Sequence, residues 1–474
     1  MADPFLQAHW LEPLIFDVGG RAPISIRDQI LRGHYLVDRA FNAGLLSSGN
    51  SILVVGAGVA GATTAILAAR RGVRTLLVDA SGQPFKLQAN CTSRWVDPVQ
   101  YDWPMPHFDS GQWPLLAAVS PHTVDFGFAA DYADRIASQW RTTLNLLRAA
   151  HLGTLHVSFN TSMHGWPAPA PGGPPVTSVG VSLSRGGGPP RTFGFHLVVL
   201  ARGMASERCV VEDDPPKFGT TPTHFEGVHF WQSDRFDAPD LGLPSPFAHP
   251  VLVSGSGDGA LQDFIRLVTG AKSAREVLEA ALGSLPGTIA ELRSALWPED
   301  DQGHRGSLWN ENAAQDHEVY LRVHQEHVAA VSRLVHGPSW AVIASALDKL
   351  VVGRPADRVR LAHSCDHFSG CYPLNRFVVL LLCAYVEGRF SISPLLPQRQ
   401  TVKVEPRSGS LHPCTQGCWG PDHDVTFIDA TCVARGKASG PIAYSGVVIR
   451  HGIAMQALPA GGRMARQSLP YHLP

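Results

Sequence analysis

Three glycines at the end of an apolar segment could bring the backbone into contact with a phosphate group. Gly56, Gly58 and Gly61 follow the run Ser51–Val55 and open an alanine-rich stretch. In this spacing the first glycine permits a tight strand-to-helix turn, the second lets the backbone approach a pyrophosphate, and the third lets the helix pack on the strand. The N–H groups at the helix start then face the phosphates. The remaining loop residues are Ala57, Val59 and Ala60.

An acidic residue stands where the ribose of such a dinucleotide would lie. Asp79 comes 18 residues after Gly61, at the end of a second apolar run, Thr75–Val78, and Ala80 follows it. A carboxylate there can accept hydrogen bonds from ribose hydroxyls. The strand, turn, helix and acid together predict a dinucleotide site, and a purely structural turn is the alternative.

A second motif of the same kind follows the apolar run Val251–Val253. It contains Gly255, Gly257, Asp258 and Ala260, and alanine is allowed at the third glycine position. The usual second strand does not follow at once, because residues 271–356 have a helical pattern. We expect Val359–Ala362 to be the delayed strand and 271–356 to be a helical insertion. A degenerate second motif that binds nothing is the alternative.

The elements that position these loops indicate an α/β fold. Apolar strands joined through helices predict parallel sheets buried on both faces. Three β-rich pieces at 154–161, 176–184 and 192–200 predict a β-meander added to the first unit. The predicted fold is therefore two Rossmann-like dinucleotide-binding units with parallel sheets, a β-meander and a helical insertion.

Two such motifs about 200 residues apart resemble the two-dinucleotide-binding-domain flavoproteins. That superfamily includes thioredoxin-reductase-like enzymes and flavin monooxygenases. The segments Leu197–Gly203 and Gly446–Gly452 are similar to its strand-and-turn junctions. The resemblance implies FAD at the first loop, Asp79, Ala80 and Gly203, and NAD(P)H at the second. The domains expected are an N-terminal helical arm (1–50), an FAD-binding domain (51–215), a second Rossmann-like domain (216–456) and a tail (457–474).

The segment 91–104 follows the second strand, so it could run over the flavin ring. Arg94 in this segment is a candidate cofactor contact, and the alternative is a packed loop whose arginine pairs with an aspartate. The redox cysteine pair of the reductases is absent, since Cys91 stands alone. These features favour an FAD-dependent oxidoreductase acting on a small molecule, linked to NAD(P)H, with monooxygenation as the first guess. The alternatives are a flavin oxidase or dehydrogenase with a vestigial second site, and a non-catalytic sensor or regulatory subunit.

The composition excludes several other classes of protein. The 474 residues carry a net charge of −1, without the basic surface of a nucleic-acid binder. The longest apolar run, Phe377–Val386, is about half of the ~20 residues that span a bilayer. Eight scattered cysteines and no signal-peptide pattern favour the cytoplasm. A homo-oligomer is compatible with the sequence. We expect no metal site, because the pairs Cys365/Cys371 and Cys414/Cys418 do not match a standard zinc module.

Overall fold

The computed structural model describes residues 3–19, 25–105, 108–109, 112–113, 124–167, 176–203, 207–212, 224–243, 247–309, 313–407, 422–429 and 438–452. These residues form two compact units. Unit 1 takes Met1–Thr92 and Gln112–Ala205, and unit 2 takes Ser93–Gly111 and Ser206–Ala454. This division differs from the expected one in two ways. Residues 1–50 belong to unit 1, and residues 93–111, expected in the first domain, belong to unit 2. The predicted tail at 457–474 lies outside the described residues.

Unit 1 contains a six-stranded sheet in the order β1-β2-β13-β3-β4-β9. Its strands are β1 (Trp10–Glu12), β2 (Ile15–Asp17), β3 (Ser51–Val55), β4 (Arg74–Val78), β9 (Leu155–Ser158) and β13 (Leu197–Leu200). Neighbouring strands are parallel except for β1 and β2. The N-terminal segment is therefore more than a helical arm, because it supplies one edge of this sheet.

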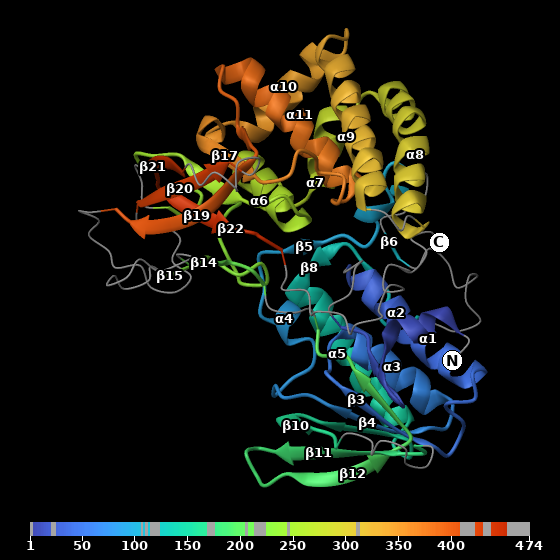
Figure 1. Ribbon diagram of the computed structural model, residues 1–474. Helices are drawn as coiled ribbons and strands as arrows, with labels where there is room; N and C mark the ends of the chain where they lie inside the picture. Colours follow the sequence, from blue (N-terminus) through green and yellow to red (C-terminus); the bar gives the residue numbers. More distant parts are fainter. Residues whose placement is uncertain are drawn as a thin grey trace. The chain divides into compact units, whose positions relative to one another are not determined.

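Helices cover one face of this sheet and a smaller sheet covers the other (Figure 1). The helices of unit 1 are α1 (Pro4–His9), α2 (Ile26–Asn42), α3 (Val59–Arg70), α4 (Lys86–Ala89) and α5 (Ala133–Ala150). The smaller antiparallel sheet consists of β10 (Thr161–Gly165), β11 (Val179–Arg185) and β12 (Arg191–Phe195). Val181 and Leu183 of β11 pack in one core with Leu53 and Val198 of the large sheet. Short strands β6 (Gln112–Trp113), β7 (Phe128–Ala129) and β8 (Asp131–Tyr132) complete the unit.

Unit 2 has the same layers around a four-stranded parallel sheet, β18-β17-β16-β22. Its strands are β16 (Val251–Ser254), β17 (Val359–His363), β18 (Leu395–Pro397) and β22 (Gly446–Ile449). An antiparallel sheet of β19 (Arg399–Pro406), β20 (His423–Asp429) and β21 (Ala438–Tyr444) packs on one face through Val404 and Phe427. The other face is covered by α6 (Asp258–Thr269) and α11 (Pro373–Phe390). Unit 2 also contains β5 (Trp95–Val96), β14 (Val210–Glu212), β15 (His224–Glu226) and the 3₁₀ turns Gln100–Asp102 and Ala356–Arg358.

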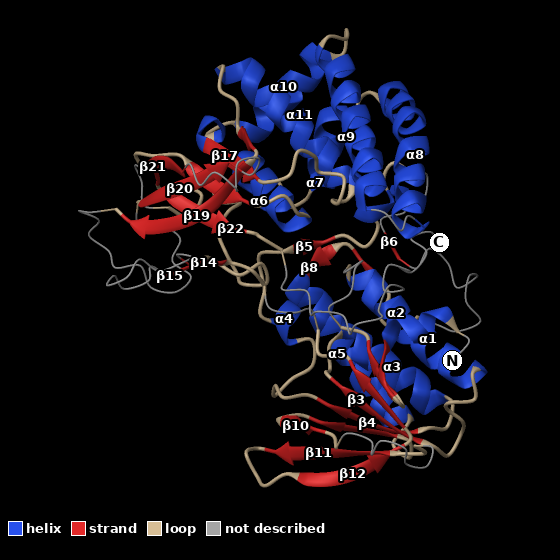
Figure 2. Cartoon of the chain, viewed as in Figure 1, coloured by secondary structure: helices blue, strands red, loops and turns tan. Residues whose placement is uncertain are grey.

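The helical insertion lies between α6 and β17, as the sequence predicts. Its helices are α7 (Ala274–Leu282), α8 (Pro286–Trp309), α9 (Ala313–Val335) and α10 (Trp340–Val351), and Figure 2 shows them as a helical block. Only residues 71–73 separate the equivalent helix α3 from β4 in unit 1. The parallel pairing of Val251 with Val359 confirms the delayed strand. None of the described helices, α11 included, is long and apolar enough to cross a membrane.

The predicted meander of three β-rich pieces needs correction. The piece at 154–161 divides into β9, which joins the parallel sheet, and the start of β10, which does not. The piece at 192–200 divides in the same way at His196, between β12 and β13. A continuous β-type run does not show where the backbone changes its pairing partner, so the sequence pattern merges strands of two sheets.

Candidate functional site

The loop between β3 and α3 accepts only glycine at two of its positions. Gly56 has a φ of +108°, and a Cβ atom there would lie 2.1 Å from the carbonyl oxygen of Ala201. A Cβ atom at Gly61 would lie 1.9 Å from the carbonyl oxygen of Gly56. Gly58 differs, because a Cβ atom there would meet no described atom within 4 Å. The loop thus packs closely on Ala201, which follows β13, and on its own helix, and it leaves open space beside Gly58, where a pyrophosphate would approach.

Helix α3 offers its N-terminus beside this open space. Gly58 is the N-cap residue, and no described side chain caps the helix. Ala57, Val59 and Ala60 are buried, so they contribute backbone rather than exposed side chains. Uncapped N–H groups and the positive end of the helix dipole attract an anion such as a diphosphate.

The carboxylate of Asp79 lies at the end of β4, beside the same loop. Its Oδ2 atom accepts a hydrogen bond of 2.6 Å from the N–H of Ala57. Its Oδ1 atom accepts hydrogen bonds from the N–H and the hydroxyl of Ser81, at 2.7 and 2.5 Å. These bonds orient the carboxylate, which is partly exposed, and Ala80 beside it is exposed. A carboxylate has about four acceptor positions, so Asp79 keeps capacity for a ribose hydroxyl.

The junction at Gly203 is bordered by the N-terminal segment. Gly203 has a φ of +87°, and a Cβ atom at Gly19 would lie 2.6 Å from its carbonyl oxygen. The carboxylate of Asp17 accepts a hydrogen bond of 2.8 Å from the N–H of Gly19 and pairs with Arg202 over 3.3 Å. The sequence pattern does not indicate Asp17, because the strand that ends with it has only three residues. Asp17 therefore joins the residues at the carboxyl edge of this sheet.

Unit 2 repeats the geometry of the glycine loop. Gly255 has a φ of +150°, and a Cβ atom there would lie 2.1 Å from the carbonyl oxygen of Arg450. A Cβ atom at Gly257 would meet no described atom within 4 Å. Ala260 is fully buried at the position equivalent to Gly61. The second motif therefore forms the same turn, with the same open position, as the first.

Two backbone hydrogen bonds anchor each loop to its neighbouring strands, and they correspond between the units. One runs from the first loop glycine to the adjacent parallel strand, and the other runs from the junction residue to the strand before the loop. In unit 1, the N–H of Gly56 donates to the carbonyl oxygen of Val78 and the N–H of Ala201 donates to that of Val55, both over 2.7 Å. In unit 2, the N–H of Gly255 donates to the carbonyl oxygen of Ala362 over 2.8 Å, and the N–H of Arg450 donates to that of Ser254 over 2.7 Å. The two loops are therefore structural duplicates.

The second loop differs from the first at the ribose position. Since Ala362 corresponds to Val78, His363 stands where unit 1 has Asp79. The Nδ1–H group of His363 donates to the carbonyl oxygen of Cys365 over 2.6 Å. Burial lowers the pKa of His363, so the ring is neutral at neutral pH. This position offers neither a carboxylate to a ribose diol nor a cation to a 2′-phosphate.

The carboxylate of Asp258 is directed into unit 2 rather than toward the loop surface. It accepts hydrogen bonds of 2.8 Å from the N–H of Tyr372 and from the side-chain amide of Asn375. Burial raises the pKa of Asp258 to about 6. Its backbone starts α6 beside the loop, and its side chain connects that helix with the start of α11.

Arg94 does not match its predicted role as a cofactor contact. Its side chain is buried in unit 2, where it pairs with Asp263 and lies 3.1 Å from Asp234. Its Nε–H group donates to the carbonyl oxygen of Phe230 over 2.7 Å, and Arg450 pairs with the same Asp263. The alternative of a packed loop with an arginine–aspartate pair describes Arg94 correctly.

Two sheets with parallel central strands, each with a glycine loop between a strand and the helix that follows it, define a chain with two Rossmann-type folds. Residues 54–119 match the family model described as "NAD(P)-binding Rossmann-like domain", which confirms the predicted Rossmann-like fold of this segment. No curated protein matches the chain.

Three of the solved structures that are similar to this chain are two reductases and a complex with FAD and NADP. One is T. acidophilum thioredoxin reductase, with 10% identity, a TM-score of 0.33, and coverage of 85% of this chain and 76% of that chain. Another is the bacillithiol disulfide reductase of Bacillus cereus, with 9% identity, a TM-score of 0.41, and coverage of 85% and 78%. A third is OTEMO in complex with FAD and NADP, with 12% identity, a TM-score of 0.36, and coverage of 86% and 72%.

Proposed function

We propose that this protein is an FAD-dependent oxidoreductase that takes electrons from NAD(P)H and acts on a small molecule. The duplicated loop carries this proposal. Each unit has a glycine loop with open space at its second glycine and an uncapped helix start behind it. A chain with two dinucleotide sites can hold both a flavin and the nicotinamide that reduces it.

The residues at the ribose positions support the assignment of the two cofactors. Unit 1 has the hydrogen-bonded carboxylate of Asp79, which fits the adenosine ribose of FAD. Unit 2 has the neutral ring of His363 at the same place. With neither a carboxylate nor a guanidinium there, we expect NADH and NADPH to reduce the protein with similar efficiency.

Monooxygenation is the reaction type that we favour. Cys91 is buried and has no second cysteine at the spacing of a redox pair, so Cys91 does not support dithiol chemistry. A bound flavin supplies hydride acceptance and reaction with oxygen, while the protein binds it, orients it and excludes water. The small-molecule substrate is part of this proposal.

A flavin oxidase or dehydrogenase with a vestigial second site is the alternative that one observation favours. Asp366 lies three residues after His363, and its carboxylate is 3.4 Å from Nε2 of His317 on α9 of the insertion. The insertion thus contacts the end of β17 at which a nucleotide ribose would bind. In this case the electrons come from the substrate, and the second loop is structural.

Cofactor content and anaerobic reduction test these proposals in two steps. We expect the full-length protein to purify with FAD, or to bind it stoichiometrically when it is supplied, as measured by absorbance and mass spectrometry. In stopped-flow mixing, rapid flavin bleaching by NADH and NADPH supports the NAD(P)H-linked enzyme. Bleaching only by an organic substrate supports the oxidase or dehydrogenase. A folded protein that binds no flavin contradicts the proposed function, and a bound flavin that no donor reduces supports the sensor.

A further inference from the structure

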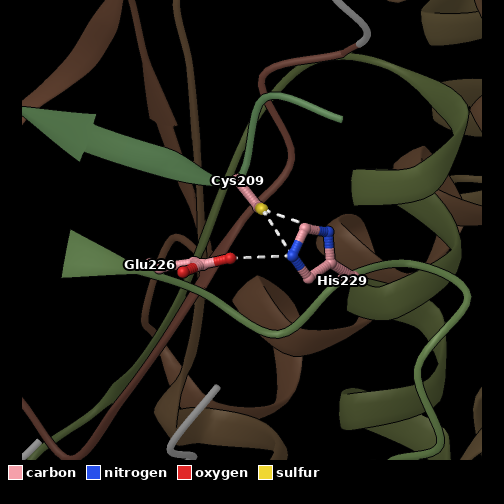
Figure 3. A group of neighbouring side chains, drawn as sticks. All are labelled: Cys209, Glu226 and His229. Atoms are coloured by element: carbon pink, nitrogen blue, oxygen red, sulfur yellow. Dashed lines mark hydrogen bonds and ion pairs between the residues drawn. The ribbon is translucent and has the colours of Figure 1, made fainter. Parts of the chain in front are cut away.

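Three side chains with metal-binding atoms meet in unit 2, outside both glycine loops. Cys209 precedes β14, Glu226 ends β15, and His229 lies three residues further on (Figure 3). The two strands pair antiparallel, and the N–H of Gly227 donates to the carbonyl oxygen of Cys209 over 2.9 Å. This pairing places the sulfur, the carboxylate and the imidazole within 4.8 Å of one another.

The separations between these atoms are close to those of a zinc site. The Sγ atom of Cys209 is 3.6 Å from Nε2 of His229, and that Nε2 atom is 2.9 Å from Oε1 of Glu226. Tetrahedral zinc with bonds of about 2.3 Å to sulfur and about 2.0–2.1 Å to nitrogen and oxygen separates S and N by about 3.6 Å and N and O by about 3.4 Å. The Sγ atom of Cys209 is also 3.4 Å from Nδ1 of His229, so the imidazole has to turn its Nε2 atom toward the sulfur. The glutamate has to move by about 0.5 Å.

A second carboxylate lies beside the imidazole. Oε2 of Glu207 lies 3.5 Å from Nδ1 of His229, the ring nitrogen that faces away from Glu226. Glu207 is itself held by the N–H of Phe230, at 2.7 and 2.9 Å, and by Arg450 at 3.4 Å. Metal-binding histidines almost always direct their other ring nitrogen to such a group, which fixes the tautomer and the orientation of the ring.

We propose that Cys209, Glu226 and His229 bind one divalent ion of the zinc type through Sγ, a carboxylate oxygen and Nε2. Thiolate and imidazole ligands select zinc over magnesium or calcium. His229 is 48% exposed, so the ion can enter from solvent, and a water molecule can take the fourth position. Glu207 is a positioning residue that acts through His229.

The site would fasten the β14–β15 hairpin to the junction that follows β22. The N–H of Arg208 donates to the carbonyl oxygen of Gly452 over 2.8 Å, and the N–H of His451 donates to the carbonyl oxygen of Arg208 over 3.1 Å. Cys209 follows Arg208 directly, so an ion bound to Cys209 would also hold the two backbone hydrogen bonds of Arg208 in place. Zinc is therefore expected to stabilise unit 2 by mass action, and this effect is independent of any flavin.

Cobalt binding to the full-length, metal-free protein tests the site. We expect one equivalent of Co²⁺ to produce a thiolate-to-cobalt charge-transfer band, read as a difference spectrum, and Zn²⁺ to remove it. The band should be absent from Cys209→Ser and present in the control Cys365→Ser, which alters an exposed cysteine elsewhere. The other described group of candidate ligands, His317, Asp366 and His367, contains no sulfur and gives no such band.

Two further variants keep the test decisive if Cys209→Ser fails to fold. His229→Gln changes a half-exposed side chain, and we expect it to fold and to weaken metal binding by more than 100-fold. Glu207→Gln should weaken it by roughly 10- to 100-fold, the effect of losing a partner that orients a ligand. A wild-type protein without the band overturns the proposal, as does a band that persists in both Cys209→Ser and His229→Gln.

Discussion

The carboxylate of Asp258 accepts a hydrogen bond of 2.8 Å from the side-chain amide of Asn375, which connects the first residue of α6 with the first turn of α11. Asn375 is fully buried, and Asp258 is half-buried. The pKa of Asp258 is about 6 in the folded chain, against 3.8 as its ordinary value. Ionising this group thus costs more in the folded protein than in the unfolded one.

Asp258→Asn should change how stability depends on pH. Between about pH 4 and pH 6 the folded wild type retains a proton that the unfolded chain has released, so its stability falls as the pH rises and then levels off. The amide does not titrate, so this fall is absent from the variant. We expect the free energy of unfolding of the variant, relative to that of the wild type, to increase by about 2–3 kcal/mol from pH 4 to pH 7. Urea unfolding at both pH values measures it, and parallel profiles would contradict the raised pKa.

Gly58→Val and Gly56→Ala should separate loss of cofactor from loss of fold. Gly58 has a φ of −72° and open space beside it, so valine should leave the melting temperature of the flavin-free protein unchanged and fill the pyrophosphate position. Gly56→Ala places a Cβ atom 2.1 Å from the carbonyl oxygen of Ala201, so it should cost about 3 kcal/mol or more. Flavin absorbance and thermal unfolding are the measurements, and Gly194→Val, at an exposed strand position, is the control. A folded Gly58→Val protein with full flavin content would falsify the first site.

Gly257→Val makes the equivalent change in the second loop. We expect this variant to keep its flavin and to lose at least about tenfold in the rate of flavin reduction by NADH and by NADPH, because the side chain occupies the diphosphate position. Stopped-flow absorbance checks this, with Gly440→Val on an exposed strand as the control. An unchanged reduction rate means that the second loop does not bind the donor, and it favours the vestigial alternative.

Asp300→Ala should loosen the helical insertion. Asp300 on α8 accepts from Nε2 of His327 on α9 over 2.8 Å and from Arg376 on α11 over 2.9 Å, and all three are buried. Removing this carboxylate leaves a buried guanidinium without its counter-charge, which typically costs 3–5 kcal/mol.

The neighbouring Glu299 on the same helix provides the control for this variant. It pairs with Arg322 over 3.1 Å between partly exposed side chains, and its loss should cost less than about 1 kcal/mol. Denaturant unfolding compares the two variants. Equal destabilisation by Asp300→Ala and Glu299→Ala would show that the buried contact contributes no more than the surface one.

The sequence predicts those parts of the fold that depend on local pattern. The strand before Gly56, the glycine turn and the acid at Asp79 lie within one short stretch, and the structure has them as predicted. The delayed strand at Val359 is also correct, because a β-type run after a helical block has few other places to pair. The predicted domain limits and the undivided meander do not match the structure, since strand exchange between sheets depends on distant partners.

Side-chain partners far apart in sequence could not be predicted in this way. Arg94 pairs with Asp263, 169 positions away, so its local sequence gave no indication of that partner. Cys209 and His229 lie close together only because β14 pairs with β15. Asp17 likewise depends on a three-residue strand. A single sequence identifies such residues only when their neighbours in space are also neighbours along the chain.

The chain order of unit 2 has a consequence during synthesis on the ribosome. β16 pairs with β17, about 100 residues later, and with β22, almost 200 residues later. Closing contacts of this range is entropically costly and slow. Until Gly446–Ile449 leave the exit tunnel, one edge of the apolar strand Val251–Ser254 lacks its partner, and an unpaired apolar edge favours aggregation. A nascent chain halted in this interval would therefore be a natural client for chaperones, whereas the central strands of unit 1 are complete by Leu200.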